Sequence, residues 1–399
     1  MIDLAEKKKL QNEFLAELNN ILTYWAHYTI DINKGGFYGA VSNNNIPDIE
    51  ANKGSILNAR ILWSFAAGFK LTGNILYKQM AERAYHYITS YFIDREYGGV
   101  YWSLTSDGQP LDTKKQIYAI AFTIYGLAEY YQISKNPEVL EYAEQLYNAI
   151  EIHSYDNIKG GYIEAFTCDW KEIEDARLSL KDANERKTMN THLHILEAYT
   201  NLYRIWPNAE LAVQIKKLIE IFTTYIINPS TSHLNLFFDD DWMVKSSTVS
   251  YGHDIETSWL LLEAAKELND EVLIKRIETV CLQMARVSTE GLNNDGSLNY
   301  EYEPVKQELV EEKHWWVQAE AVVGFFNAWQ ISHEEQFFEL SKKSWQYIKK
   351  SIVDAENGEW FWGIDKNNSI MQGYTKVGFW KCPYHNSRVC CEMVKRLSV

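Results

Sequence analysis

Several features that would direct this chain to a membrane or a nucleic acid are missing from its sequence. No apolar run approaches the roughly 20 residues of a membrane span, and the first ten residues are charged, without a signal core or a small-residue cleavage site. No lysine- and arginine-rich run is interleaved with aromatic residues, and the formal net charge of −15 repels phosphate backbones. We therefore expect a cytoplasmic protein without a nucleic-acid or membrane partner.

Motifs for metals and nucleotide cofactors are also absent. The five cysteines are odd in number and form no CxxC pair, so neither a disulfide framework nor a zinc site is indicated. Histidines and carboxylates could in principle bind a metal, but there is no HExxH and no compact His/Cys cluster. No GxGxxG or GxxxxGK[ST] loop occurs either. We expect no metal and no cofactor.

What the chain has in quantity is aromatic residues. Fourteen Trp, 26 Tyr and 16 Phe supply flat apolar faces with polar edges, which suit packing against sugar rings but also fill large cores. The hydrophobic and charged fractions, 46% and 23%, are ordinary for a globular protein with a sizeable core. Composition alone therefore gives modest support to carbohydrate binding.

Hydrophobic periodicity predicts an all-α protein. Apolar residues three and four apart define about twelve amphipathic segments of helical length. They lie near residues 5–28, 53–72, 75–91, 114–133, 137–152, 189–205, 209–226, 252–268, 271–287, 312–332, 335–352 and 383–397.

Short glycine and aromatic stretches between alternate segments predict turns or small β-hairpins. They begin at Gly35, Gly98, Gly160 and Gly358, with weaker counterparts at 234–241 and 294–302. An isoleucine precedes three of these glycines by the same ten residues (Ile88, Ile150 and Ile348). Six helix-hairpin-helix units with a period of about 60 residues predict an (α/α)6 barrel over a single domain, 1–399. An open solenoid is the alternative.

In such a barrel the helix after each hairpin belongs to the inner ring, with its first turns facing the central cavity. The polar and aromatic residues in these turns are Arg60; Tyr118; Asn190 and His194; His253, Glu256 and Trp259; Trp316 and Glu320; and His385 with Arg388. We expect them to converge on one pocket.

Two of these helices carry several polar or aromatic side chains along one face. Spacings of three place His253, Glu256 and Trp259 on one face, and spacings of four and three do the same for Asn190, His194 and Glu197. The alternatives are an exposed histidine at a helix start with an acid favoured by the helix dipole, and a satisfied core histidine.

Three nearby residues are given no role in the site. Asp254 is interpreted as an acid of the first helical turn, favoured by the helix dipole. His233 and His314 have no comparable partners in the sequence and are interpreted as structural or exposed.

At these residues the sequence resembles the N-acylglucosamine 2-epimerase superfamily and, within it, the cellobiose 2-epimerases. The resemblance covers essentially the whole chain. It rests on the stretches 53–63, 96–102, 188–199, 250–256, 315–321 and 381–386. It implies the same barrel, and interconversion of glucose and mannose configuration at the reducing end of β-1,4-linked disaccharides such as cellobiose and lactose.

The resemblance also implies roles. His253 and His385 would be the acid/base pair, with Arg60, Glu256 and Glu320 around the reacting sugar. The substrate-binding residues would be Tyr118, Asn190, His194, Trp259, Trp315, Trp316, Trp380 and Arg388. We expect a disaccharide substrate and a monomer or weak dimer.

The proposed chemistry explains these residue types. A closed pyranose must open to an aldehyde before its C2 proton is acidic, and histidine can transfer both protons near neutral pH. Arg60 would stabilise the enediolate that forms. The alternatives are an N-acylglucosamine epimerase or mannose isomerase on the same barrel, an inverting glycoside hydrolase using Glu256 and Glu320, and a non-catalytic sugar-binding protein.

Overall fold

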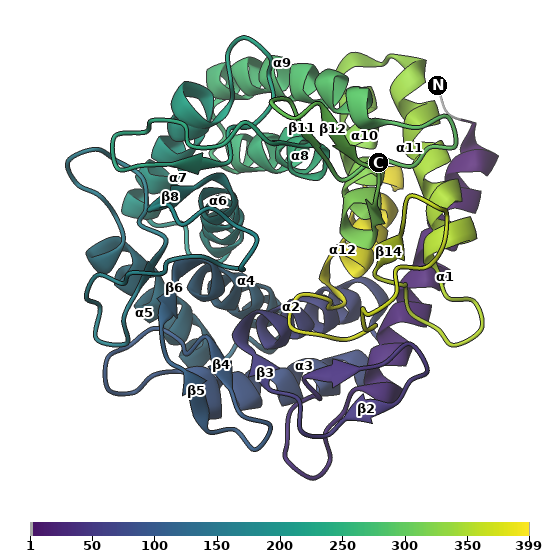
Figure 1. The fold of residues 1–399 in the computed structure, drawn as a ribbon. Coiled ribbons are helices and arrows are strands. Elements are labelled where there is room, and N and C mark those ends of the chain that lie inside the picture. The colour runs from purple at the N-terminus through teal and green to yellow at the C-terminus, as the bar shows by residue number, and fades with distance from the viewer. Residues whose placement is uncertain (1–2, 399) are drawn as a thin grey trace.

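Twelve α-helices within residues 3–398, the part of the chain that this computed structural model describes, alternate between two concentric rings (Figure 1). The inner helices are α2 (Ser55–Thr72), α4 (Ile117–Ser134), α6 (Met189–Tyr203), α8 (Tyr251–Glu267), α10 (Trp315–Ser332) and α12 (Tyr384–Leu397). The outer helices are α1 (Leu4–Tyr28), α3 (Ile75–Tyr87), α5 (Pro137–His153), α7 (Ala209–Ile221), α9 (Glu271–Ser288) and α11 (Glu335–Tyr347). The predicted (α/α)6 barrel is confirmed.

The inner helices are apolar on nearly all sides because they pack against both the outer ring and one another. Each contacts the next around the ring, and α12 returns to α2, so the ring is closed. An open solenoid is thereby ruled out. In α4, every residue from Ile117 to Tyr130 is buried, as expected for a helix without a solvent face.

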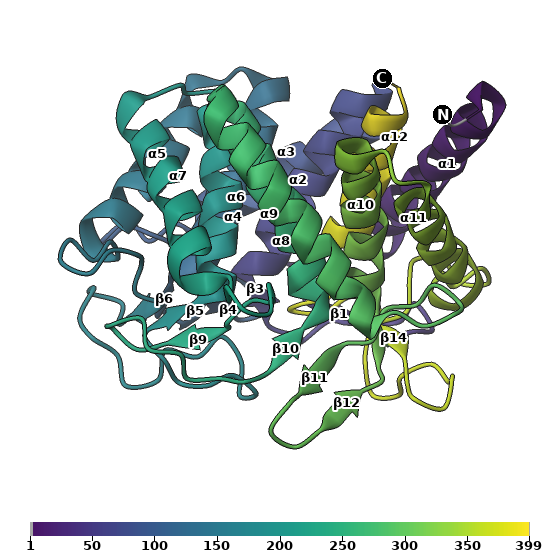
Figure 2. The ribbon, with the colours of Figure 1, turned by 90° about the horizontal axis from the view of Figure 1, so that it is seen from above.

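Six short hairpins follow the outer helices. Each closes on an antiparallel bridge: Ile30–Phe37, Ile93–Val100, Tyr155–Tyr162, Ile227–Leu234, Leu292–Leu298 and Val353–Trp360. Of the two stretches that were weak in the sequence, 294–302 overlaps the hairpin closed by Leu292 and Leu298, whereas 234–241 begins only at the last residue of the hairpin closed by Ile227 and Leu234. All six gather at one face of the barrel, at the bottom of Figure 2.

Fourteen strands link neighbouring repeats into small antiparallel sheets on this face. They are β1 (Ala40–Val41), β2 (Pro47–Asp48), β3 (Lys53–Gly54), β4 (Ser103–Leu104), β5 (Pro110–Asp112), β6 (Lys115–Gln116), β7 (Ala165–Phe166), β8 (Lys187–Thr188), β9 (Phe237–Phe238), β10 (Val249–Ser250), β11 (Glu301–Glu303), β12 (Glu308–Val310), β13 (Lys313–His314) and β14 (Gly363–Ile364). The strand before an inner helix pairs with the strand that follows the next hairpin, as β3 does with β4 and β6 with β7.

A buried ion pair repeats at four hairpins. The aspartate that opens the hairpin accepts two backbone N–H groups of the turn through Oδ1, as Asp94 does from Glu96 and Tyr97. Its Oδ2 accepts from a lysine further along the chain, and Lys115 lies 2.5 Å away in this case. The other three pairs are Asp31–Lys53, Asp156–Lys187 and Asp354–Lys376.

The first helix closes the barrel against the last repeat. The indole nitrogens of Trp345 and Trp360 donate to Glu13 and Glu17 of α1, at 2.9 and 2.7 Å. Trp25 of α1 donates in turn to Glu359, at 2.7 Å. Because α1 also packs along α12, it is the outer helix that covers the last inner helix.

The observed helices follow the predicted segments with small differences at their ends. The segments predicted from 53, 114 and 312 begin as helix two or three residues later, because β3, β6 and β13 precede them. Those predicted to end at 91, 226 and 352 finish in π-helical turns at Ile88–Phe92, Phe222–Ile226 and Ile348–Ile352. None of the described helices is long and apolar enough to cross a bilayer.

Candidate active site

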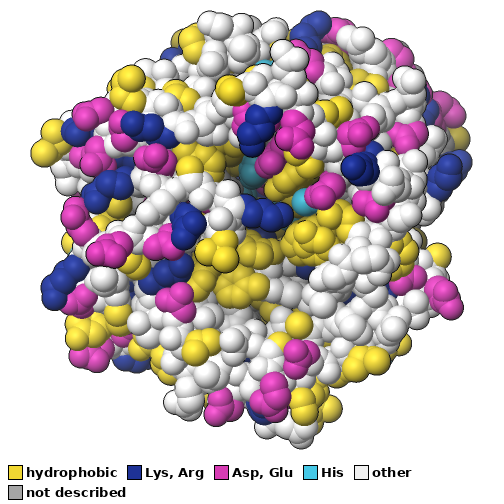
Figure 3. Space-filling view, viewed as in Figure 1, with side chains coloured by type: hydrophobic (Ala, Val, Ile, Leu, Met, Phe, Trp, Pro, Cys, Tyr) yellow, Lys and Arg dark blue, Asp and Glu magenta, His cyan; other side chains and the backbone are white. Residues whose placement is uncertain are grey.

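The hairpin face is hollowed at its centre. Histidine side chains are visible in the hollow, with hydrophobic surface around it (Figure 3). The inner helices begin on this face, so their first turns surround the hollow (Figures 1 and 2). These are the turns in which the sequence predicted site residues.

Arg60 of α2 is a buried cation among aromatic rings. Its Nη2 donates to the hydroxyl of Tyr118 at 2.8 Å, and Nη1 lies 3.8 Å from the sulfur of Cys382. The guanidinium carbon is 4.0 Å from the ring centroid of Phe122 and 4.8 Å from that of Tyr384. Within the described residues its Nε has no hydrogen-bond partner, so the group keeps donor capacity for a ligand.

His253 and His385 approach the same indole from different helices. The ring of Trp316 lies 4.8 Å from His253 and 5.7 Å from His385, centroid to centroid. Nδ1 of His253 hydrogen-bonds to Oγ of Ser250 at 2.8 Å, whereas Nδ1 of His385 lies 2.8 Å from Oε1 of Glu320. The two imidazoles therefore share a wall of the site but are held differently.

Burial keeps both imidazoles neutral. Desolvation lowers the pKa of His253, and desolvation together with the positive charges of Arg388 and Arg60 lowers the pKa of His385 well below its ordinary value. In neutral histidine one ring nitrogen donates and the other accepts. Since Glu320 can only accept when ionised, Nδ1 of His385 carries the proton and Nε2 is left as a base.

His194 is held in the same way as His385. Its Nδ1 lies 2.9 Å from Oε2 of Glu197, one turn further along α6. Its ring meets the edge of Tyr118 at 4.9 Å between centroids. Asn190, one turn before it, has a buried side-chain oxygen without a partner among the described residues. The predicted stripe on α6 is thus present.

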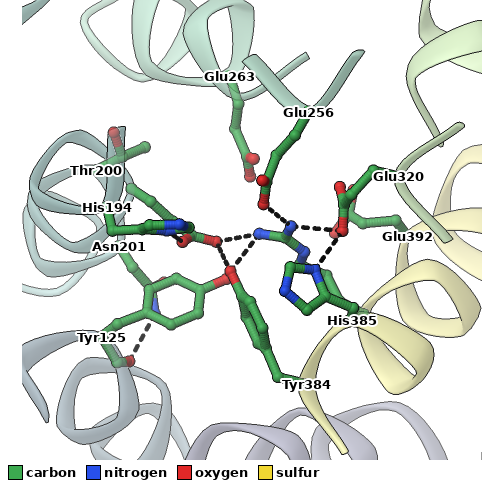
Figure 4. A network of polar contacts seen from close by, with 12 residues as sticks. Tyr125, His194, Thr200, Asn201, Glu256, Glu263, Glu320, Tyr384, His385 and Glu392 are labelled. Carbon is green, nitrogen blue, oxygen red and sulfur yellow. Dashed lines mark hydrogen bonds and ion pairs between the residues drawn. The ribbon is translucent and has the colours of Figure 1, made fainter. Parts of the chain in front are cut away.

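Arg388 of α12 joins three carboxylates through ion pairs that are drawn in Figure 4. Its Nη1 bonds to Glu197, while Nη2 bonds to Glu256 at 2.5 Å and to Glu320 at 2.7 Å. Arg388 is 1% exposed. We expected it to contact the substrate, but it lies under the site with both terminal nitrogens bonded to protein.

The predicted tryptophans differ in how deeply they are buried. Trp259 is fully buried and donates to Glu320 at 3.0 Å, and Trp315 is buried against Trp362 at 4.7 Å between ring centroids. Trp316 and Trp380 are only partly buried. Of the four, the last two are the ones with surface available for a ligand.

Asp254 lies in the first turn of α8 as interpreted, and His233 and His314 are structural, but the sequence did not reveal the partners of these three residues. Asp254 is fully buried, and its carboxylate accepts from the backbone N–H of Leu234 and lies 2.7 Å from Nδ1 of His233. His233 therefore has a carboxylate partner. So does His314, which is buried, stacks on Tyr300 at 4.0 Å and lies 2.8 Å from Glu312. His233 and Asp254 come from a hairpin and a helix 21 positions apart, and Glu312 lies in the loop before His314, so helical spacing carries no signal for either pair.

One group of side chains has metal-like geometry. Ligand atoms of Glu256, Glu320 and His385 lie within 4.8 Å of one another, and all three residues are buried. The guanidinium of Arg388 already bonds to both carboxylates. The positive charge beside these ligand atoms is therefore supplied by the protein itself, through Arg388.

Sequence reasoning gave no role to Tyr384. Its hydroxyl bonds to Glu197 and to Arg388, and its ring lies 4.6 Å from that of His385. A signal was present, because Tyr384 directly precedes His385 and stands four residues before Arg388. Spacing alone did not reveal that its hydroxyl belongs to the charged network.

Comparison with known proteins gives consistent results. Residues 36–388 match the family model of N-acylglucosamine 2-epimerase. The chain is 50% identical to a cellobiose 2-epimerase of Bacteroides fragilis, over 98% of this chain and 100% of that protein, and 39% identical to one of Ruminococcus albus, over 95% and 96%. The structure of cellobiose 2-epimerase from Bacillus thermoamylovorans superposes with a TM-score of 0.93 at 38% identity, covering 98% of this chain and 100% of that one.

Proposed function

The chain belongs to the N-acylglucosamine 2-epimerase family, and we propose that it inverts C2 of the reducing-end sugar of β-1,4-linked disaccharides, converting cellobiose to glucosyl-mannose and lactose to epilactose. The observation that carries the proposal is the pair of neutral histidines, His253 and His385, against the ring of Trp316. Epimerisation needs a proton removed from one face of C2 and returned to the other.

The reaction begins with ring opening. A proton leaves the anomeric hydroxyl as O5 gains one, and the C1–O5 bond breaks to give an aldehyde beside C2. A histidine then takes the C2 proton, and the electron pair of the C–H bond moves into C1–C2 to form an enediolate. Return of a proton to the opposite face completes the inversion. Only protons move, so the balance requires no redox cofactor.

Arg60 supports this sequence electrostatically. Negative charge develops on O1 only when the enediolate forms, so a fixed guanidinium lowers that barrier more than it stabilises the neutral sugar. Tyr118 and Cys382 hold this guanidinium in place. A lysine would supply the charge without the planar fork.

Partly buried aromatic rings support a second sugar unit. Trp380 lies 5.9 Å from Trp102 and 6.0 Å from Tyr118, centroid to centroid. Indole faces pack well against the apolar faces of sugar rings. We assign the reducing-end unit to Trp316 and the non-reducing unit to Trp380.

Proton NMR of cellobiose in D2O with EDTA-treated protein tests the proposal. We expect the anomeric signals of glucosyl-mannose and deuterium at C2. If neither develops while N-acetylglucosamine or mannose reacts, the proposed substrate is wrong and the histidine roles survive. Accumulation of free glucose would contradict epimerisation and favour Glu256 and Glu320 as a hydrolytic pair.

A further inference from the structure

Two histidine–glutamate pairs face each other across the floor of the site. Nδ1 of His194 lies 2.9 Å from Glu197, and Nδ1 of His385 lies 2.8 Å from Glu320. The first pair belongs to α6, and the second joins α10 to α12. In both, a carboxylate oxygen that accepts from Nδ1 selects the tautomer that leaves Nε2 unprotonated.

A single guanidinium connects the two pairs. Nη1 of Arg388 bonds to Oε1 of Glu197 and Nη2 to Oε1 of Glu320, so a continuous chain runs from His194 to His385. Figure 4 shows this chain, with Tyr384 beside it. Rings on both sides confine the guanidinium, whose carbon lies 4.4 Å from the centroid of Tyr384 and 4.8 Å from that of Trp259.

Resting on the function proposed above, we propose that Arg388 is a positioning residue that fixes the orientation and proton occupancy of both His194 and His385 through Glu197 and Glu320. It is 1% exposed and its terminal nitrogens are taken by carboxylates, so it does not act on the sugar directly. Planarity matters, because a fork can hold carboxylates from two different helices at once, whereas an ammonium is a point charge.

The charges around the chain are consistent with this role. Burial alone would raise the pKa of Glu197, but Arg388 and His194 outweigh burial and lower it to about 2. Burial and the neighbouring carboxylates instead raise the pKa of Glu256 and of Glu320, against the opposing effect of Arg388. Without the guanidinium, three carboxylates would share a buried space with no counter-charge.

Other charged groups also face the two imidazoles. Burial lowers the pKa of His194. Glu197 opposes this effect, whereas the positive charges of Arg60 and Arg388 add to it. His385 feels burial, then Arg388, Arg60 and His194, against the opposing charge of Glu197. Arg388 is the one charge that both lowers these pKa values and bonds to both orienting carboxylates.

Three variants separate the role of Arg388 from that of a substrate contact. Arg388→Met removes the positive charge, so the acid limb of the kcat profile should move up by about one pH unit or more, with kcat at pH 7 reduced about 100-fold and KM changed less than about threefold. Arg388→Lys keeps the charge, so the limb should move less while kcat stays low. Glu197→Gln removes a negative charge, so the limb should move in the opposite direction, toward acid.

Histidine ring 15N NMR of the free enzyme gives a readout that does not depend on turnover. In Arg388→Met we expect both His194 and His385 to lose their single tautomer. In Glu197→Gln, which leaves the guanidinium charge in place, we expect His385 as well to lose its single tautomer, although Glu197 does not touch it. This cross-effect keeps the proposal testable if Arg388→Met does not fold.

The matched control is Arg204→Met. Arg204 also bridges two glutamates, Glu263 at 2.5 Å and Glu267 at 2.8 Å, away from the histidines, and its loss should leave kcat and the pH profile unchanged. An effect on KM alone in Arg388→Met, or a His385 signal that does not move in Glu197→Gln, would overturn the proposal. A wild-type enzyme that fails to epimerise cellobiose would refute the proposed function, while the NMR experiment would still decide the role of Arg388.

Discussion

His253 and His385 meet one indole but differ in what holds their second nitrogen, a serine hydroxyl in one and a carboxylate in the other. The carboxylate supports a positive charge on His385 after it takes a proton, while His253 has no such partner. The two are therefore unequal bases, and the forward and reverse reactions should depend on them differently.

Replacing either histidine should stop exchange at C2. We expect His385→Ala and His253→Asn each to reduce solvent deuterium incorporation into cellobiose by about 10²–10⁴-fold, the usual contribution of a positioned acid or base. Circular dichroism should show an unchanged fold. Incorporation at the wild-type rate in both variants would refute the assignment.

The acid limb of activity should lie below the ordinary histidine range. Burial, Arg388 and Arg60 lower the pKa of His385 well below its ordinary value, so it gains a proton only at a more acidic pH than a free histidine does. We expect kcat for cellobiose at pH 6 to remain close to its value at pH 7.5, and to fall only at lower pH as the imidazole gains a proton. A midpoint near pH 6.5 would contradict this.

His192 predicts a pH dependence of stability. It is fully buried, accepts the backbone N–H of Tyr162 through Nε2, and has its pKa lowered by burial to about 4. The unfolded chain binds this proton first, so its contribution is complete above pH 6.5 and is lost between about pH 6.5 and 4, by up to about 3 kcal/mol. Urea titrations at several pH values measure this. The difference in unfolding free energy between wild type and His192→Gln should become smaller as the pH falls from about 6.5 to 4. A constant difference would contradict it.

At the scale of single residues, spacing along one helix was a reliable guide and partners from elsewhere were not. The contact between His194 and Glu197 lies within one turn of a helix and was foreseeable. Arg388 was on the right helix, but its partner Glu197 is 191 positions away. No one-dimensional pattern reports which carboxylates will surround a guanidinium after folding.

Among the secondary-structure elements, the hairpin is the one whose internal contacts repeat along the chain. Asp94 accepts backbone N–H groups of its own turn and binds Lys115 in β6, so one carboxylate connects the turn to the strand that precedes the next inner helix. Glu359 does similar work in the last repeat at φ +63°, accepting from Lys381, Asn386 and Trp25. Since Asn386 follows His385, this hairpin supports the first turn of α12.

Breaking one of these ion pairs should be costly. Lys115→Met leaves Asp94 charged and buried, and we expect a loss of about 3–5 kcal/mol in unfolding free energy. Adding Asp94→Asn should recover part of that loss, because the uncompensated charge is removed. Thermal or urea unfolding of the two single variants and the double variant measures it. Additive losses would show that the pair is not coupled.

The positions of the helices were predicted closely, but the ends of some of them were not. Periodicity follows the apolar face of a helix, and that face continues into the π-helical turns after the helices, whereas β3 and β6 before them carry no apolar side chain that could mark the boundary. The change from helix to strand at Lys53 or Lys115 depends on pairing with another repeat. Local pattern cannot detect a partner strand some 50 residues away.

For the whole molecule, the closed inner ring predicts cooperative unfolding. Each inner helix packs on two others, so no subset of repeats keeps its full set of neighbours when the rest unfolds. We expect a single transition in urea at which circular dichroism and tryptophan fluorescence coincide, as for one domain. Separate midpoints would indicate independently folding parts.

The repeat in the sequence favoured the barrel but left an open solenoid as the alternative, and it did not show how the barrel is joined. The bridge between Val41 and Val377 and the bond from Trp360 to Glu17 connect segments more than 330 residues apart. These contacts are not periodic, so they leave no trace in the pattern of the chain.

The pairing of α1 with α12 also decides how the protein could be attached to a solid support. Gln11 near the start of α1 bonds to Ser398 just beyond α12, while the other end of α12 carries His385 at the hairpin face. Both ends of the described chain therefore lie on the side of the barrel opposite the cavity. An enzyme anchored to a resin at either end would keep its cavity turned toward the flowing sugar solution.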